Sequence, residues 1–115
     1  MIKVAINGFG EVGNDIFEQL QGAEGYQVIA INFIGDKENF YRFCALHYPD
    51  IYVFYESDIS NLPWDALEID CVADTTNQKG NIKKHIKAGS RHVVMVEPNK
   101  KVKCYRKKGR SKWLK

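Results

Sequence analysis

The sequence has no apolar run that approaches the roughly 18 to 20 residues needed to span a lipid bilayer. Its first residues, Met1 to Ile6, lack the charged region, long apolar stretch and small-residue cleavage site of a secretory signal peptide. Cysteine is scarce, and the three present, Cys44, Cys71 and Cys104, are far apart. These absences argue against transmembrane and disulfide-rich secreted classes and predict a soluble, cytoplasmic protein with reduced thiols.

Metal ligation is not expected, because no cysteine pair has the short spacing of a zinc knuckle or a redox dithiol. The histidines lack i, i+4 spacing with one another or with cysteine, and we predict them at the surface or at helix ends: His47, His85 and His92. Cys44 and Cys71 lie among apolar residues and are predicted to be inert core thiols. Cys104 lies among cations, but a chemical role for it is not favoured.

Charge is distributed unevenly along the 115 residues, whose formal net charge is +3. Residues 100–115 contain nine of the 17 Lys and Arg residues and no Asp or Glu. The other 8 basic residues face 14 acidic ones, so residues 1–99 carry −6 against +9 for the C-terminal segment. The length allows one domain-sized core. We predict one domain over residues 1–98 and a basic tail over residues 99–115 that is flexible or docks separately.

Apolar, β-rich runs alternate with segments of helical periodicity. Strands are predicted over residues 2–7, 26–32, 51–56, 69–74 and 92–97. One helix is predicted directly after the glycines that follow residue 7, and two more over residues 37–47 and 80–88. A short irregular or 3₁₀ connection is predicted over residues 60–67. Strands that alternate with helices predict right-handed parallel crossovers. The predicted fold class is therefore α/β, a parallel sheet with helices on both faces.

The strongest motif is Gly8-Phe9-Gly10-Glu11-Val12-Gly13, a G-x-G-x-x-G pattern between the first predicted strand and the first predicted helix. In that context the first glycine permits a tight turn, the second lets a pyrophosphate approach the backbone, and the third lets helix and strand pack closely. The N–H groups of Glu11, Val12 and Gly13 would then point toward the phosphates. The pattern indicates a dinucleotide-binding fold of the Rossmann type; the alternative is a turn kept only for packing.

The same fingerprint calls for an acidic residue about 20 positions beyond the glycines, where it binds the adenosine ribose hydroxyls. That position is Phe33. Asp36 would take its place only if the following loop folded back. Glu11 puts a carboxylate beside the expected pyrophosphate, where like charges repel. We therefore expect weak binding, and Phe33 gives no basis for a preference between NAD and NADP.

Longer stretches of the chain resemble one known family. The opening, Lys3-Val4-Ala5-Ile6-Asn7-Gly8-Phe9-Gly10 with Val12-Gly13, closely resembles that of glyceraldehyde-3-phosphate dehydrogenase. Further landmarks follow in the family's order: Val28-Ile29-Ala30-Ile31-Asn32, Leu62-Pro63-Trp64, Asp70-Cys71-Val72-Ala73-Asp74-Thr75-Thr76 and Ala88-Gly89-Ser90-Arg91-His92-Val93-Val94. The resemblance covers residues 2–98 and is to the family's N-terminal cofactor domain.

The resemblance implies a cofactor site made of Gly8, Phe9, Gly10, Glu11, Val12, Gly13, Asn32, Phe33, Thr75 and Thr76. The sequence departs from the family where Phe33 replaces an acid, Ser57 an arginine, and Val96 a serine near the nicotinamide. The family's catalytic Cys and His segments, and its substrate and tetramer-forming domain, have no counterpart in these 115 residues. The resemblance thus implies a cofactor domain that is not catalytic alone.

Two functions stay open at this point. The leading hypothesis is a domain that binds NAD, NADP or an adenine nucleotide weakly, without oxidising a substrate. The alternative is an interaction protein that has lost its nucleotide site and associates with a dehydrogenase, another protein, or RNA through its tail. Because an open sheet without a second domain should leave apolar surface uncovered, self-association is also expected.

The basic tail interleaves cations with Tyr105 and Trp113, a composition that can neutralise phosphates and stack on bases. We favour a solvated tail, or one folded onto the acidic domain, over a tail that binds nucleic acid. A third alternative is a truncation or frame-shift relic, because the residues after Pro98 do not continue the family pattern.

Overall fold

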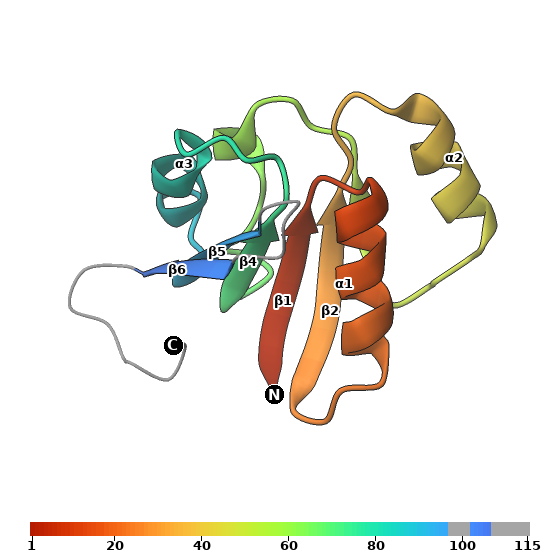
Figure 1. Cartoon of the computed structure of the whole chain (residues 1–115), viewed down its shortest axis with the longest axis horizontal. Helices are drawn as coiled ribbons and strands as arrows, with labels where there is room; N and C mark the ends of the chain where they lie inside the picture. Colours follow the sequence, from red (N-terminus) through yellow and green to blue (C-terminus); the bar gives the residue numbers. More distant parts are fainter. Residues whose placement is uncertain (97–101, 107–115) are drawn as a thin grey trace.

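The computed structural model describes residues 1–96 and 102–106, the latter by their backbone (Figure 1). The elements follow in chain order: β1 (Ile2–Asn7), α1 (Glu11–Gln21), β2 (Tyr26–Asn32), α2 (Lys37–Ala45), β3 (Tyr52–Phe54), the 3₁₀ turn η1 (Ile59–Asn61), β4 (Cys71–Asp74), α3 (Asn81–Lys87), β5 (His92–Val96) and β6 (Val102–Arg106). The predicted alternation of strands and helices is therefore present.

The strands form one sheet in the order β3-β2-β1-β4-β5-β6. The first five are parallel, and β6 alone runs antiparallel, against β5. β1 lies between β2 and β4, so the chain moves outward from β1 in one direction as far as β3 and then returns to its other side. This arrangement confirms the predicted Rossmann-type α/β fold.

The sixth strand was not predicted. β6 lies within the segment expected to be a flexible or separately docked tail, and it pairs with β5 from Val96 opposite Val102 to His92 opposite Arg106. The pairing agrees with the alternative of a segment docked on the domain, but the strand itself was not predicted, because local composition does not show that a sheet edge offers backbone hydrogen bonds to an adjacent segment. The proposed domain boundary at residue 98 stays a prediction.

Successive residues of the central strands point to opposite faces of the sheet, as strand geometry requires. Ile6, Val28 and Ile31 pack with Phe17 of α1 and Phe43 of α2 on one face. On the other face, the residues between β3 and β4 supply the larger side chains over small strand residues, in a cluster of Ala5, Ala30, Val72, Ile59, Leu62, Trp64 and Ile69. Figure 1 shows α1 and α2 apart from α3, which packs near η1.

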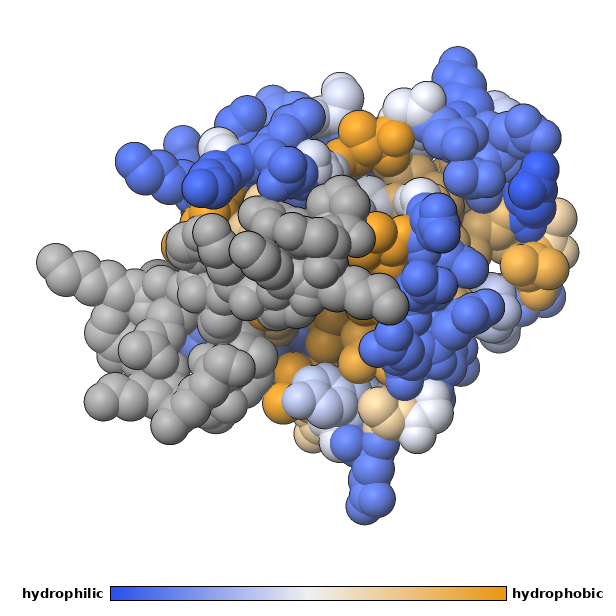
Figure 2. Space-filling model, viewed as in Figure 1, coloured by the Kyte–Doolittle hydropathy of each residue, from blue (hydrophilic) through white to orange (hydrophobic). Residues whose placement is uncertain are grey.

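Several large apolar side chains stay exposed on α2 and around β3. Tyr41, Leu46 and Tyr52 are 65%, 62% and 57% exposed. Figure 2 shows hydrophobic residues at the surface between hydrophilic ones on this side of the molecule. Within residues 1–96 and 102–106, no helix has the length and apolarity to cross a membrane.

The cysteine prediction was half correct. Cys71 is buried in β4, as expected of a core thiol. Cys44 is exposed on α2, contrary to the prediction. The preceding residue, Phe43, is the one that α2 turns into the core, and neighbouring helix positions are rotated by about 100° from each other. The third cysteine has no described side chain.

Candidate functional site

The glycine turn lies where the sheet changes direction. β1 and β4 are neighbours, and the segments that leave them lead to opposite sides of the sheet. In open α/β sheets, ligands bind outside the carboxyl ends of the strands at such a switch point. The residues directly after β1 and β4 are Gly8 and Thr75, and Thr75 Oγ1 donates to the carbonyl of Gly8 at 2.9 Å.

The three glycines of the motif have different surroundings. Gly8 adopts φ +91°, and a Cβ there would lie 2.5 Å from Thr75 Oγ1. A Cβ on Gly13 would collide with the carbonyl oxygen of Gly8. A Cβ on Gly10 would meet no atom within 4 Å. The first and third glycines are thus required by the fold itself, whereas the second leaves open space next to the backbone, where a phosphate would approach.

In the first turn of α1, the backbone attracts an anion, whereas one side chain repels it. Gly10 is the N-cap and supplies no side-chain acceptor to the N–H groups of Glu11, Val12 and Gly13. Those N–H groups and the helix dipole attract negative charge. Glu11, however, is exposed in the same turn and adds its own carboxylate. The turn can therefore hold a diphosphate, but less strongly than a turn with a neutral or basic residue at position 11.

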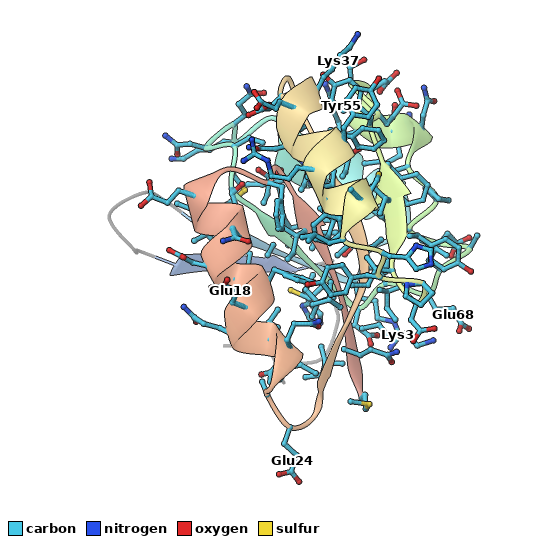
Figure 3. All side chains as sticks on the ribbon, turned by 90° about the vertical axis from the view of Figure 1, so that its right-hand side faces the viewer. Lys3, Glu18, Glu24, Lys37, Tyr55 and Glu68 are labelled. Carbon is cyan, nitrogen blue, oxygen red and sulfur yellow. The ribbon has the colours of Figure 1, made fainter. Side chains whose placement is uncertain are left out.

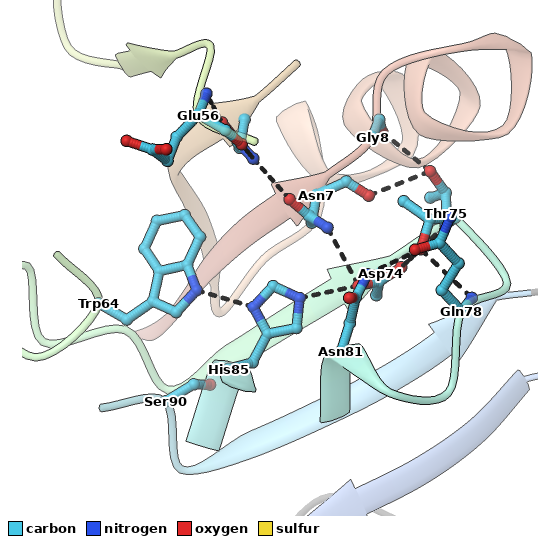
Figure 4. Close-up of polar contacts among 12 residues, drawn as sticks. Asn7, Gly8, Glu56, Trp64, Asp74, Thr75, Gln78, Asn81, His85 and Ser90 are labelled. Atoms are coloured by element: carbon cyan, nitrogen blue, oxygen red, sulfur yellow. Dashed lines mark hydrogen bonds and ion pairs between the residues drawn. The ribbon is translucent and has the colours of Figure 1, made fainter. Parts of the chain in front are cut away.

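Polar residues that end three adjacent strands are joined by hydrogen bonds under this turn (Figure 4). Asn32, the last residue of β2, donates to Asn7 Oδ1 at 2.8 Å. Asn7, the last residue of β1, donates to Asp74 Oδ2, at the end of β4, at 3.1 Å. All three side chains are fully buried. Because parallel strands bring their carboxyl ends to one edge of the sheet, three residues far apart in sequence form one continuous polar row.

The row continues through a buried histidine. His85 Nε2 lies 2.8 Å from Asp74 Oδ2, and Trp64 Nε1 donates to His85 Nδ1 at 2.9 Å. An indole N–H can only donate, so His85 Nδ1 must accept and its proton lies on Nε2. His85 is therefore neutral while both hydrogen bonds hold, and it donates to the Asp74 carboxylate. Burial raises the pKa of Asp74, but the hydrogen bonds from His85 and Thr76 outweigh burial and hold that pKa below its ordinary value.

One of the three histidines is not where the sequence analysis placed it: His92 is the first residue of β5 and is fully buried. His47 is exposed just beyond α2, and His85 lies in the last turn of α3, a helix end, but is fully buried. The hydrogen bonds of His85 were not predicted, because short spacing to a metal-ligating residue was the only signal considered. Asn81 and His85 occur at i, i+4 on α3, and Asn81 also donates to Asp74, at 3.2 Å. This polar pair on one helix face was the available sequence signal.

The threonines predicted for the site stand next to the glycine turn. Thr75 Oγ1 contacts the carbonyls of both Asn7 and Gly8, which fixes the end of β4 against the end of β1. Thr76 donates through its backbone N–H and its hydroxyl to Asp74 Oδ1, at 2.8 and 2.6 Å. Both are half-buried. The glycine turn and the two threonines are thus brought together.

The predicted ribose side is not assembled in the same way. Phe33 is 2% exposed, and its ring packs against Phe9, Phe40 and Phe43 at centroid distances of 5.1 to 5.5 Å. Phe33 therefore offers no side-chain atom at the mouth of the site. Asp36 does not replace the missing acid, because its carboxylate accepts from the backbone N–H of Asn39 as the N-cap of α2.

In the described part of the chain, no group of three or more His, Cys, Asp or Glu side chains could hold a metal ion.

The side chain of Asn32 forms hydrogen bonds with the backbone of Glu56 as well as with Asn7. Its amide donates to the carbonyl of Glu56 at 3.0 Å, and its side-chain oxygen accepts from the N–H of Glu56 at 2.8 Å. It serves as a link between β2 and the segment after β3. Asn32 is thus a structural support of the site by its contacts.

Sequence comparisons give relatives for this fold and site. The chain is 32% identical, over an alignment 124 positions long, to glyceraldehyde-3-phosphate dehydrogenase 1 of Kluyveromyces lactis, with 87% of the chain and 38% of that protein covered. It is also 32% identical, over an alignment of the same length, to glyceraldehyde-3-phosphate dehydrogenase of Salmonella typhimurium, with 86% and 37% covered. The chain spans less than two fifths of the length of these curated relatives.

No protein-family model matches the chain. The aligned share nevertheless includes most of its residues, and the fold is the parallel α/β sheet that the motif predicts. Together these findings confirm the resemblance derived from the sequence: the chain is similar to glyceraldehyde-3-phosphate dehydrogenase over most of its own length and over less than two fifths of that enzyme's.

Proposed function

We propose that the turn from Gly8 to Gly13 binds the diphosphate of NAD, NADP or a related adenine nucleotide. The observation that carries this proposal is the difference among the glycines: Gly8 and Gly13 are enclosed by protein atoms, and Gly10 faces open space. Open space by itself is shared by Gly22 and Gly25; what distinguishes Gly10 is that its open side lies at the N-terminus of α1, where backbone N–H groups attract an anion. Further support comes from the switch-point position and from the relatives, which are named as dehydrogenases.

Binding is weak in this proposal, and it does not discriminate between NAD and NADP. Phe33 provides neither the acid that accepts ribose hydroxyls nor a cation for a 2′-phosphate. Glu11 repels the diphosphate. No oxidation is expected from these 115 residues by themselves, because the family's catalytic cysteine and histidine segments are not among them. Binding rests on backbone N–H groups and the helix dipole.

The test is calorimetric titration of NAD, NADP and AMP into the full chain and two valine variants. Gly10→Val puts a side chain where the diphosphate would approach, and Gly22→Val is the matched control, since a Cβ on Gly22 at the far end of α1 also meets no atom. We expect micromolar binding of NAD and NADP, weaker binding of AMP because it lacks the diphosphate, loss in Gly10→Val and retention in Gly22→Val. Melting temperatures of both variants verify folding.

Two results would contradict the proposal. Equal NAD affinity in Gly10→Val and the unmodified chain would place any nucleotide elsewhere. No heat and no thermal shift with any of the three nucleotides would favour the second candidate, an interaction protein with the fold but without the ligand. The observation behind that candidate is the burial of Phe33, which removes the ribose contact.

A further inference from the structure

A groove between α1 and α2 begins at the glycine turn, where Gly10 and Glu11 line it, and extends along α1 to Glu18. Its volume is about 410 Å³, within the size range of ligand sites. Its floor is aromatic, formed by Phe9, Phe17, Phe43 and Tyr48. Phe43 and Tyr48 are stacked with ring centroids 5.1 Å apart, and Phe17 meets both rings edge to face. We call this the α1–α2 groove; Figure 3 faces the two helices that form it.

The rim of the α1–α2 groove is acidic. Glu11 and Glu18 line it from α1, seven positions apart and so on the same side of the helix. Within residues 1–96, neither forms an ion pair, and α1 contains no Lys or Arg. Arg42 also lines the groove, but its guanidinium is 2.8 Å from Glu38, which compensates its charge.

The apolar floor and the acidic rim together determine which ligand chemistry fits the groove. Leu46 and Tyr48, at one end of the groove, are 62% and 38% exposed. Aromatic faces attract cations as well as apolar groups, and carboxylates attract cations. The groove therefore fits a segment that carries Lys or Arg side chains together with a large apolar one.

This chain contains such a segment. Residues 107–115, Lys-Lys-Gly-Arg-Ser-Lys-Trp-Leu-Lys, combine five cations with adjacent Trp113 and Leu114 and have no acid. The preceding strand, β6, is at the sheet edge opposite to β3, and its last residue, Arg106, pairs with His92 at the amino end of β5. The groove is by contrast lined by Phe9 and Gly10, just beyond the carboxyl end of β1, and by residues of α1 and α2. Arg106 and the groove of one copy are thus at opposite ends of the sheet.

We propose that the α1–α2 groove binds residues 107–115 of a second copy of this chain. Glu11 and Glu18 receive the cations, and the aromatic floor receives Trp113 or Leu114. The attraction is between exposed charges, so added salt weakens the association. The groove shares Gly10 and Glu11 with the turn proposed to bind a diphosphate, so self-association is measured without nucleotide; Glu18 and the tail charges test it apart from the turn.

The test is sedimentation equilibrium of the full chain at low and high salt. We expect reversible, micromolar self-association at low salt that salt reverses. The double variant Glu11→Gln/Glu18→Gln should weaken it about tenfold, since each neutralised exposed charge removes a small electrostatic contribution and several add. The control Asp15→Asn/Glu24→Gln makes the same change in net charge at exposed positions outside the groove and should leave the association constant within twofold.

A charge exchange identifies the segment. Glu11→Lys/Glu18→Lys and Lys112→Glu/Lys115→Glu should each fail to self-associate, and an equimolar mixture of the two should associate again. A monomer at every concentration in the unmodified chain would overturn the proposal. So would an equal effect of the groove and control variants, or a mixture that stays dissociated, because the contact would then lie elsewhere. Circular dichroism of each variant confirms that all are folded.

Discussion

The two buried clusters on either side of the central strands differ in the kind of contact that holds them. The aromatic cluster consists of Phe9, Phe17, Phe33, Phe40, Phe43 and Tyr48. In the ring pairs of this cluster that include Phe9, Phe33 or Phe43, the centroids are 5.1 to 5.9 Å apart and the interplanar angles range from 23° to 78°. The polar chain consists of Asn32, Asn7, Asp74, His85 and Trp64, joined atom to atom at 2.8 to 3.1 Å.

The difference shows which region tolerates substitution. Apolar contact is non-directional, so the aromatic cluster depends on volume more than on the identity of each ring. In the polar chain every donor needs an acceptor at a defined place, because an unmatched buried group has lost its water without gaining a partner. The polar chain should therefore fail on a change of one atom, and the aromatic cluster only on a loss of volume.

The largest effect is expected from Asp74→Ala. This change leaves the donors of Asn7, Asn81 and His85 without their common acceptor, so the free energy of unfolding should fall by about 3 to 5 kcal/mol. Urea denaturation at neutral pH, followed by circular dichroism, measures it. Asp15→Ala, at an exposed site on α1, is the control and should change stability by less than about 0.5 kcal/mol.

Asp74→Asn sharpens the comparison, because the shape of the side chain is kept. Donors converge on both carboxylate oxygens, three on Oδ2 and the two from Thr76 on Oδ1. Whichever way the amide is turned, its NH₂ group faces a donor, so we expect a loss of at least about 2 kcal/mol. A near-neutral Asp74→Asn would show that the polar chain rearranges as freely as an apolar core.

In the aromatic cluster, Phe43→Ala should destabilise by about 3 to 4 kcal/mol because it leaves a cavity among four rings. Phe43→Leu, which keeps much of the volume, should cost less than about 1.5 kcal/mol. The same urea titrations measure both. If Phe43→Leu cost as much as Phe43→Ala, the specific ring contacts would matter more than volume, and the contrast with the polar chain would disappear.

A smaller effect is expected from Trp64→Phe. The ring stays apolar and buried, but His85 Nδ1 loses its donor, at a cost of about 1 to 3 kcal/mol. The ¹⁵N shifts of His85 in the unmodified chain should show the proton on Nε2 and none on Nδ1. A proton on Nδ1 would contradict the hydrogen-bond direction assigned to Trp64.

The smallest expected effect is the dependence of the free energy of unfolding on pH. The pKa of Asp74 is lower in the folded chain than its ordinary value of 3.8, so the folded state binds fewer protons. Its contribution is complete above that ordinary value and is lost as pH falls through the lower, folded pKa. Unfolding free energies measured between neutral pH and pH 2 should fall steeply below pH 3.8, and less steeply in Asp74→Asn. Equal slopes would contradict the assignment.

Much of the fold and part of the site could be predicted without coordinates. The strands Ile2–Asn7 and Tyr26–Asn32 match their predicted ranges. The G-x-G-x-x-G spacing gave the turn and the helix that follows it, because its first and third glycines each meet a local steric demand. The third strand was predicted too long, since Ile51 and Tyr55 lie outside the three residues that pair with β2. Pairing, unlike periodicity, depends on a neighbour.

The sequence by itself determined the α/β class, the glycine turn and the kinship with glyceraldehyde-3-phosphate dehydrogenase, because all three depend on residues close together in the chain or on their order. Tertiary structure alone decided that Phe33 faces the core, that Cys44 is exposed, that residues 102–106 join the sheet, and that Asp74, His85 and Trp64 meet. Each of these depends on how separate segments pack, and no local pattern encodes which side chains the packing of the sheet will bring together.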